Sequence, residues 1–153
     1  FSPIGTTPVF TYANSLLNNP ATVKGIRDVS WGMSARIIGI YVKVDVLYYQ
    51  LELTNESPID YDISVLRLYL RDTRKAKRTA DQEIELKPLY TAGDPSRVLA
   101  NTTCNLVVAL QKFTLPGAKY LAIEIRELNG GRNLLLKAGN KKIMHATSLT
   151  DKE

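Results

Sequence analysis

The sequence predicts an all-β fold, an immunoglobulin-like β-sandwich of two mainly antiparallel sheets with a short N-terminal helix and leader. Short segments of alternating apolar and polar residues recur along the chain, turn residues separate them, and no long segment has helical periodicity. A length of 153 residues with 44% hydrophobic residues suits one packed domain. We therefore expect a leader with a short helix over residues 1–30 and a β-sandwich domain over residues 31–153.

The leader is expected to be extended at first and then helical. Residues 1–10 contain Pro and Gly, and the helix is expected to begin near Thr11 and to end at Asn18. Residues 21–30 are predicted to be a linker. The apolar side chains of this region are expected to pack on the domain or on a neighbour; they are Phe10, Tyr12, Leu16, Leu17 and Trp31.

The strands are predicted from alternation with a period of two residues. In the segment 46–54, Leu47, Tyr49, Leu51 and Leu53 share one face, and Gln50, Glu52 and Thr54 share the other, as in a half-buried strand. The other predicted strands are residues 33–43, 61–70, 84–89, 104–110, 120–128 and 133–138, and the tail 141–150 fits a strand or a short helix. The expected core includes Leu51, Leu53, Leu66, Leu68, Val108, Leu121, Ile123 and Ile125.

Few side chains in this sequence are suited to catalysis or metal binding. A hydrolase using Cys104 and His145 is an alternative, but Cys104 opens an apolar strand and His145 belongs to a basic tail. Structural zinc needs four Cys or His ligands, and Asp60 and Asp62 lack the spacing of a calcium loop. We expect no catalytic site, cofactor, metal or small-molecule substrate.

A basic run, RDTRKAKRT, covers residues 71–79 and connects two predicted strands. Nearby carboxylates balance its charge; they are Asp72, Asp81, Glu83 and Glu85. We expect a hairpin whose contact with DNA is weak or absent, because a nucleic-acid surface usually combines several basic elements with exposed aromatic residues. A DNA-binding module that uses this hairpin is the alternative. The candidate surface contacts are Arg74, Lys75, Lys77, Arg78 and Arg132.

The segment Asn129–Arg132, NGGR, is predicted to be a tight turn between two strands. Asn and Gly accept the positive φ that such turns require. At least one of Asn129, Gly130 and Gly131 is therefore expected to have a positive φ.

Three stretches taken together resemble one family. They are KAKRTADQE at 75–83, KFTLP at 112–116 and ELNGGR at 127–132. In this order and spacing they resemble the C-terminal region of TraN, a conjugative transposon protein of Bacteroides-type elements, and the likeness covers roughly residues 14–149. The chain departs from the family pattern at Leu128 and Asn133, where family members tend to have Lys and His.

The resemblance implies a non-enzymatic structural subunit of a conjugative transfer apparatus, similar to a type IV secretion system. Its partners would be other subunits of that apparatus, and its location would be periplasmic or associated with the outer membrane. No run of apolar residues reaches the length of a transmembrane helix. Because the chain begins at Phe1, we expect a fragment or a processed form whose signal peptide lies upstream.

Overall fold

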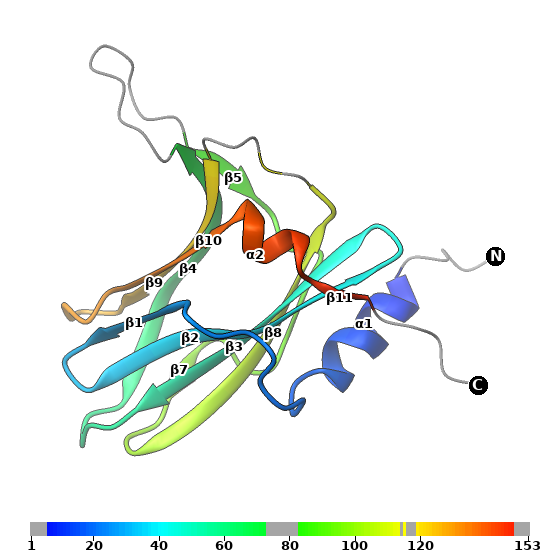
Figure 1. The fold of residues 1–153 in the computed structure, drawn as a ribbon. Helices are drawn as coiled ribbons and strands as arrows, with labels where there is room; N and C mark the ends of the chain where they lie inside the picture. Colours follow the sequence, from blue (N-terminus) through cyan, green and yellow to red (C-terminus); the bar gives the residue numbers. More distant parts are fainter. Residues whose placement is uncertain (1–5, 73–82, 114, 116–118, 149–153) are drawn as a thin grey trace, which may run out of the picture.

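Two β-sheets packed face to face form the protein (Figure 1). The computed structural model describes residues 6–72, 83–113, 115 and 119–148. Its helices are α1 (Thr6–Ser15) and α2 (Asn140–Met144). Its strands are β1 (Arg27–Ser30), β2 (Met33–Lys43), β3 (Val46–Asn55), β4 (Tyr61–Asp72), β5 (Ile84–Leu86), β6 (Tyr90–Ala92), β7 (Arg97–Val98), β8 (Thr102–Gln111), β9 (Lys119–Glu127), β10 (Leu134–Gly139) and β11 (Thr147–Ser148).

The first sheet has the strand order β1-β2-β3-β8-β6, with β11 added in parallel beside β2. The second has the order β10-β9-β4-β5, with β7 paired to one end of β4. The other strand pairs are antiparallel. This arrangement confirms the predicted all-β sandwich of two mainly antiparallel sheets.

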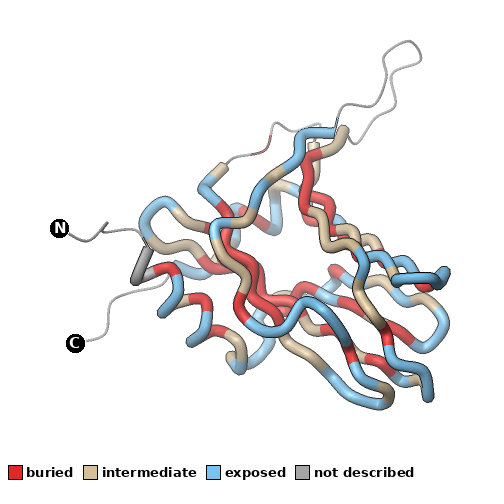
Figure 2. Tube along the Cα trace, turned by 180° about the vertical axis from the view of Figure 1, so that it is seen from behind, coloured by how far each residue is buried: buried red, intermediate tan, exposed pale blue. Residues whose placement is uncertain are grey.

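The core between the sheets comes from the apolar face of each strand. Leu51 and Leu53 of β3 and Ile123 and Ile125 of β9 are fully buried there. Seven of the eight predicted core residues are buried, and the eighth, Leu66, is partly buried against the same cluster. Figure 2 shows the buried segments running through the facing strands, with exposed residues at the turns.

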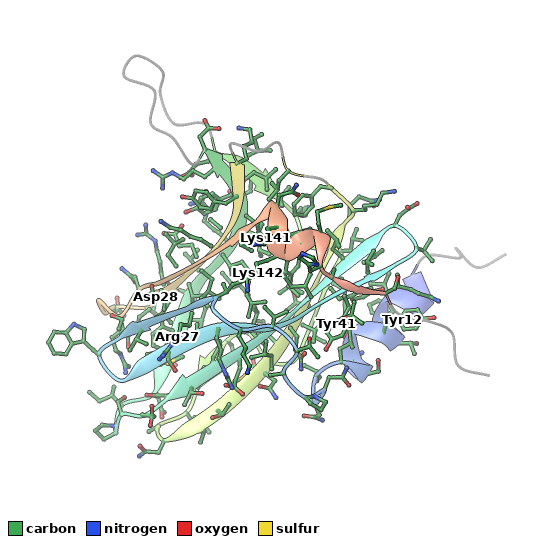
Figure 3. The ribbon with its side chains drawn as sticks, viewed as in Figure 1. Tyr12, Arg27, Asp28, Tyr41, Lys141 and Lys142 are labelled. Atoms are coloured by element: carbon green, nitrogen blue, oxygen red, sulfur yellow. The ribbon has the colours of Figure 1, made fainter. Side chains whose placement is uncertain are left out.

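The outer face of the first sheet is also partly buried, because helix α1 covers it. Val9 and Ala13 lie four residues apart on one side of the helix, Leu16 follows directly after its end, and all three pack with strand residues that point away from the central core. Those strand residues are Tyr41, Tyr48, Ala92, Val107 and Ala109. Tyr12 of α1, labelled in Figure 3, is partly buried against this cluster, and its ring lies edge-on to Tyr48 of β3 with the centroids 6.3 Å apart.

The burial of Gln50 differs from what simple alternation predicts for β3. It lies on the outer face, as expected, but it is fully buried rather than exposed. Its Nε2 donates to the carbonyl of Asn19 at 2.8 Å, and its Oε1 accepts from the Tyr41 hydroxyl at 3.4 Å. A Cβ at Gly39 would clash with the Gln50 and Tyr41 side chains, so this position needs a glycine. The segment after α1 therefore covers a polar group that alternation alone assigns to solvent.

The N-terminal region is more structured than the sequence predicts. Helix α1 begins at Thr6 instead of near Thr11, so part of the expected extended leader is helical. Arg27–Ser30, predicted to be linker, form strand β1 and pair with β2. Residues 6–30 thus supply strand β1 to the first sheet and helix α1 to its cover. The ambiguous tail contains both predicted alternatives, helix α2 and strand β11.

The edges of the two sheets meet between β1 and β10. Asp28 Oδ2 accepts a hydrogen bond from the backbone N–H of Leu135 at 2.9 Å. An edge strand leaves backbone groups unpaired, and this carboxylate satisfies one of them. Asp28 therefore links the two sheets along one side of the sandwich.

We predict that Leu68→Ala lowers the free energy of unfolding by about 2–5 kcal/mol, because it leaves a cavity in a core where Leu68 is 1% exposed. Leu66→Ala is the matched control, since Leu66 lies in the same strand and is only partly buried. Its cost should be clearly smaller. Urea denaturation of both variants measures the difference, and equal costs would contradict the assigned core.

Candidate interaction surface at the loop end of the sandwich

Four connections between strands gather at one end of the sandwich, and we call this end the loop end (Figure 1). They are residues 31–32 between β1 and β2, 56–60 between β3 and β4, 99–101 between β7 and β8, and 128–133 between β9 and β10. Both sheets contribute to the loop end. Loops held on a rigid scaffold are where proteins commonly place binding residues.

The loop 56–60 is bonded to its neighbours on both sides. The Glu56 N–H donates to the Gly32 carbonyl at 2.7 Å, which joins it to the β1–β2 turn. Asn55, just before the loop, donates through Nδ2 to the carbonyls of Ile59 at 2.8 Å and Val98 at 3.1 Å. The Ala100 N–H donates to Asp60 Oδ1 at 2.7 Å. These bonds fix three of the four connections relative to one another.

Arg132 joins the fourth connection to the same loop. Its Nη1 donates to Ser57 Oγ at 2.8 Å, and its Nη2 donates to the Asp60 carbonyl at 3.2 Å. The same guanidinium donates to Glu127 through Nε at 3.1 Å and through Nη2 at 2.7 Å. The Tyr61 hydroxyl donates to the backbone carbonyl of Arg132. Arg132 thus holds the β9–β10 hairpin against the β3–β4 loop.

The ion pair between Arg132 and Glu127 affects the protonation of the groups around it. The hydrogen bonds from Arg132 hold the pKa of Glu127 below its ordinary value, against an opposing effect of burial. Burial, with a smaller contribution from the Glu127 charge, raises the pKa of Tyr61 to about 12. Glu127 is therefore ionised and Tyr61 is neutral near pH 7, and the ion pair is maintained.

The predicted NGGR turn is a hairpin between β9 and β10, with Leu134 paired to Ile125. Asn129 has a φ of 54°, which confirms the expectation of one positive φ among the first three residues. Gly130 is needed for a different reason: a Cβ there would clash with the Glu127 carboxylate that Arg132 holds. A Cβ at Gly131 would have no atom within 4 Å.

Large apolar side chains are exposed on this rigid end. Half of the ten such side chains in the described part of the chain belong to the loop end and its adjoining strand: Val29 (53% exposed), Trp31 (85%), Ile59 (65%), Leu99 (52%) and Leu128 (54%). Trp31 also has a φ of 46°, a conformation that costs energy for a bulky side chain. Exposed apolar groups gathered together mark interaction sites more often than isolated ones do. The loop end is therefore the candidate interaction surface.

Of the five candidate surface contacts, the structure describes Arg132 alone. Arg74, Lys75, Lys77 and Arg78 lie outside the described residues, so the basic hairpin stays a prediction. Arg132 differs from the expectation of a surface contact, because it is only 9% exposed and its guanidinium is bonded within the protein. A buried guanidinium requires carboxylate and carbonyl partners, and those of Arg132 lie at the loop end. Arg132 therefore holds its loops together instead of contacting a partner.

The carboxylates beside the basic run have partners on the neighbouring strands. Arg67 forms ion pairs with Glu83 and Glu85, each at 2.9 Å, and Lys119 pairs with Asp72 at 2.7 Å. Asp81 lies outside the described residues. The strands on either side of the run, β4 and β5, pair as predicted, with Leu68 opposite Leu86.

Cys104 and His145 lie in different parts of the first sheet. His145 lies two residues before Thr147 of β11. In the sheet, Thr147 pairs with Tyr41 of β2, Tyr41 pairs with Tyr48 of β3, and Tyr48 pairs with Ala109 of β8. Cys104 is five residues further along β8, or about 16 Å at the usual rise per residue, and three strand spacings across. Burial also raises the pKa of the Cys104 thiol, which disfavours the nucleophilic thiolate. The structure does not bring this pair together.

The described residues contain neither a cluster of metal ligands nor a membrane-spanning helix. Over residues 6–72, 83–113, 115 and 119–148, no group of three or more His, Cys, Asp or Glu side chains is placed to hold a metal ion. Neither helix in this part of the chain has the length and apolar character needed to cross a bilayer.

The fold and the loop end define a class of protein: a small all-β sandwich module with an exposed apolar end. The chain belongs to the family described as Domain of unknown function (DUF4138), whose model matches residues 9–148. Comparison with curated proteins gave no significant match, and comparison with solved structures gave none either.

We predict that Arg132→Met lowers the free energy of unfolding by on the order of 3 kcal/mol, because it leaves the nearly buried Glu127 carboxylate without its partner. Arg126→Met is the control, since Arg126 is 55% exposed where it pairs with Glu124 and should cost at most about 1 kcal/mol.

The same variants test the pH dependence. Because the pKa of Glu127 is lowered in the folded protein, its contribution to stability is complete above the unfolded-state pKa, about 4.3, and is lost as the pH falls through the lower folded value. Urea denaturation below about pH 4.5 should show a shallower loss of stability in Arg132→Met than in the wild type. Identical acid dependence would contradict the assigned role of the pair.

The two glycines of the turn give a third comparison. Gly130→Ala should destabilise the protein and lower its melting temperature, because the new methyl group displaces the Glu127 carboxylate from Arg132. Gly131→Ala should have little effect, since its methyl group meets open space. Thermal unfolding followed by circular dichroism distinguishes the variants, and equal melting temperatures would contradict the packing of this turn.

Proposed function

We propose that this chain is a non-enzymatic structural subunit of a conjugative transfer apparatus and acts through protein–protein contacts made by its loop end. Its partners would be other subunits of the apparatus. The observation that carries the proposal is the set of exposed apolar side chains, Trp31 above all, on loops that hydrogen bonds hold in place.

The construction of the loop end supports a binding role. Its loops are fixed by Asn55, Asp60 and Arg132, so binding would require little ordering of the backbone. Tryptophan is among the residues that most often anchor protein interfaces, and surrounding apolar side chains help to exclude water from such an anchor. A rigid apolar end is therefore better suited to docking another protein than to enclosing a small molecule.

The sequence resemblance supports the biological setting. One of the three stretches that resemble TraN, ELNGGR, forms the hairpin with Glu127 and Arg132 that organises the loop end. A second, KFTLP, contributes Leu115 to the core and Lys112, which pairs with Asp45. The proposed location is periplasmic or associated with the outer membrane, as the resemblance implies.

The test replaces apolar loop-end residues with polar ones that keep the fold. Trp31→Asn suits the positive φ at this position, because Asn accepts that conformation better than Trp does. Combined with Leu128→Ser, it should leave the melting temperature within a few degrees of the wild type. We expect the double variant, expressed in donor cells in place of the wild-type protein, to reduce conjugation frequency and co-purification of companion subunits by about tenfold or more, since 1.4 kcal/mol of lost affinity is tenfold.

The control removes exposed apolar surface elsewhere on the molecule. Met144→Ser on helix α2 changes a side chain that is 65% exposed and does not belong to the loop end. It should leave conjugation and co-purification unchanged. A double variant that folds, accumulates and supports normal conjugation would overturn the proposed role of the loop end.

A further inference from the structure

Two arginines lie directly opposite each other on the outer face of the β1–β2 hairpin. In the antiparallel register Arg27 pairs with Arg36. The neighbouring Ala35 and Ile37 belong to the core between the sheets, so Arg36 points outward. Arg27 likewise lies on the side of β1 opposite Asp28, whose carboxylate accepts the hydrogen bond from Leu135 of the second sheet (Figure 3). Like charges in directly opposed positions destabilise a strand pair, so this placement has a cost.

The described residues supply one carboxylate for these two guanidinium groups. Arg36 Nε donates to Glu52 Oε1 at 2.7 Å, which leaves its two Nη atoms available. The backbone of Arg27 belongs to the β1–β2 ladder, but its side chain forms no hydrogen bond or ion pair with any residue in the described part of the chain. With Ser34 and Ala35, the two arginines line a shallow hollow on the surface. A second carboxylate placed there would relieve the repulsion and complete the pairing.

Apolar groups continue from this hollow toward the loop end. Val29 lies two residues after Arg27, on the same face of the strand, and is 53% exposed. Trp31 follows at the tip of the hairpin and is 85% exposed. Two guanidinium groups are thus followed by an aliphatic side chain on the same face of the hairpin and by an aromatic side chain at its tip.

We propose that the Arg27–Arg36 hollow binds a carboxylate of an acidic protein segment whose apolar residues pack on Val29 and Trp31. This inference rests on the proposed function and gives the chemistry of the partner. An arginine presents a planar fork that binds a carboxylate through two parallel hydrogen bonds. The adjacent apolar groups favour a protein segment over a nucleic-acid backbone, which would need a longer track of positive charge.

Trp31 provides the measurement, because it is the only tryptophan of the chain and follows Arg27 by four residues at the tip of the same hairpin. The probe is a short synthetic peptide of alternating leucine and glutamate. A matched peptide with glutamine in place of glutamate and a short DNA duplex serve as comparisons. We expect the acidic peptide to shift Trp31 emission to shorter wavelength and to bind at least about tenfold more tightly than the glutamine peptide, as one or two charge-assisted hydrogen bonds allow.

Substitutions assign the effect to the two arginines. Arg27→Gln and Arg36→Gln should each weaken binding of the acidic peptide by about tenfold, and Arg27→Lys should restore only part of the affinity because an ammonium lacks the guanidinium fork. Arg126→Gln removes the same charge from the second sheet and should bind like the wild type. The absence of any response to the acidic peptide, equal binding by Arg27→Gln, or tighter binding of the DNA duplex would overturn the inference.

Failure of this inference can be distinguished from failure of the proposed function. If Trp31→Asn with Leu128→Ser abolishes conjugation but the acidic peptide does not bind, the loop end still docks a partner and the carboxylate site is wrong. If the peptide binds and Arg27→Gln weakens it, while all loop-end variants conjugate normally, the carboxylate site stands and the role in conjugation is wrong.

Discussion

Burial of strand β3 on both of its faces is the constraint on which the rest of the structure depends. Leu51 and Leu53 pack toward the second sheet, while Tyr48 and Gln50 pack beneath helix α1 and the segment that follows it. A slip of one residue would exchange these two sets, so the register of β3 is strongly specified. Strands β2 and β8 pair along its whole length and take their register from it. The loops at both ends of these strands are positioned as a result.

The sequence predicted most of the strands because alternation is a local signal, but it missed contacts formed between distant segments. The strand 46–54 was recognisable from its leucines, whereas the burial of Gln50 depends on Asn19, 31 positions away. Strand β1 is short, and its residues Arg27–Ser30 are mostly polar, so nothing local marked it as part of a sheet. Its pairing with β2 comes from the tertiary fold.

The candidate site was predictable only in part for the same reason. The NGGR segment predicted a hairpin, and Asn129 adopts the positive φ expected of such a turn. The role of Arg132 was not visible, because its bond to Ser57 spans 75 positions of sequence. Trp31 is expected to pack on the domain or on a neighbour; within this chain it is exposed at the tip of a hairpin whose existence the sequence did not show, so its packing on a neighbour stays a prediction. A surface made of four separate loops appears only when the fold brings them together.

The carboxylate of Asp28, bonded to the Leu135 N–H, also bears on how copies of this protein behave at high concentration. An unguarded edge strand invites a strand from another molecule, and repeated addition of this kind leads to fibres. Here an incoming strand would have to displace Asp28 from its donor and approach a negative charge. Crowded copies are thus discouraged from uncontrolled polymerisation along this seam, and an ordered assembly is left to surfaces whose side chains can discriminate among partners.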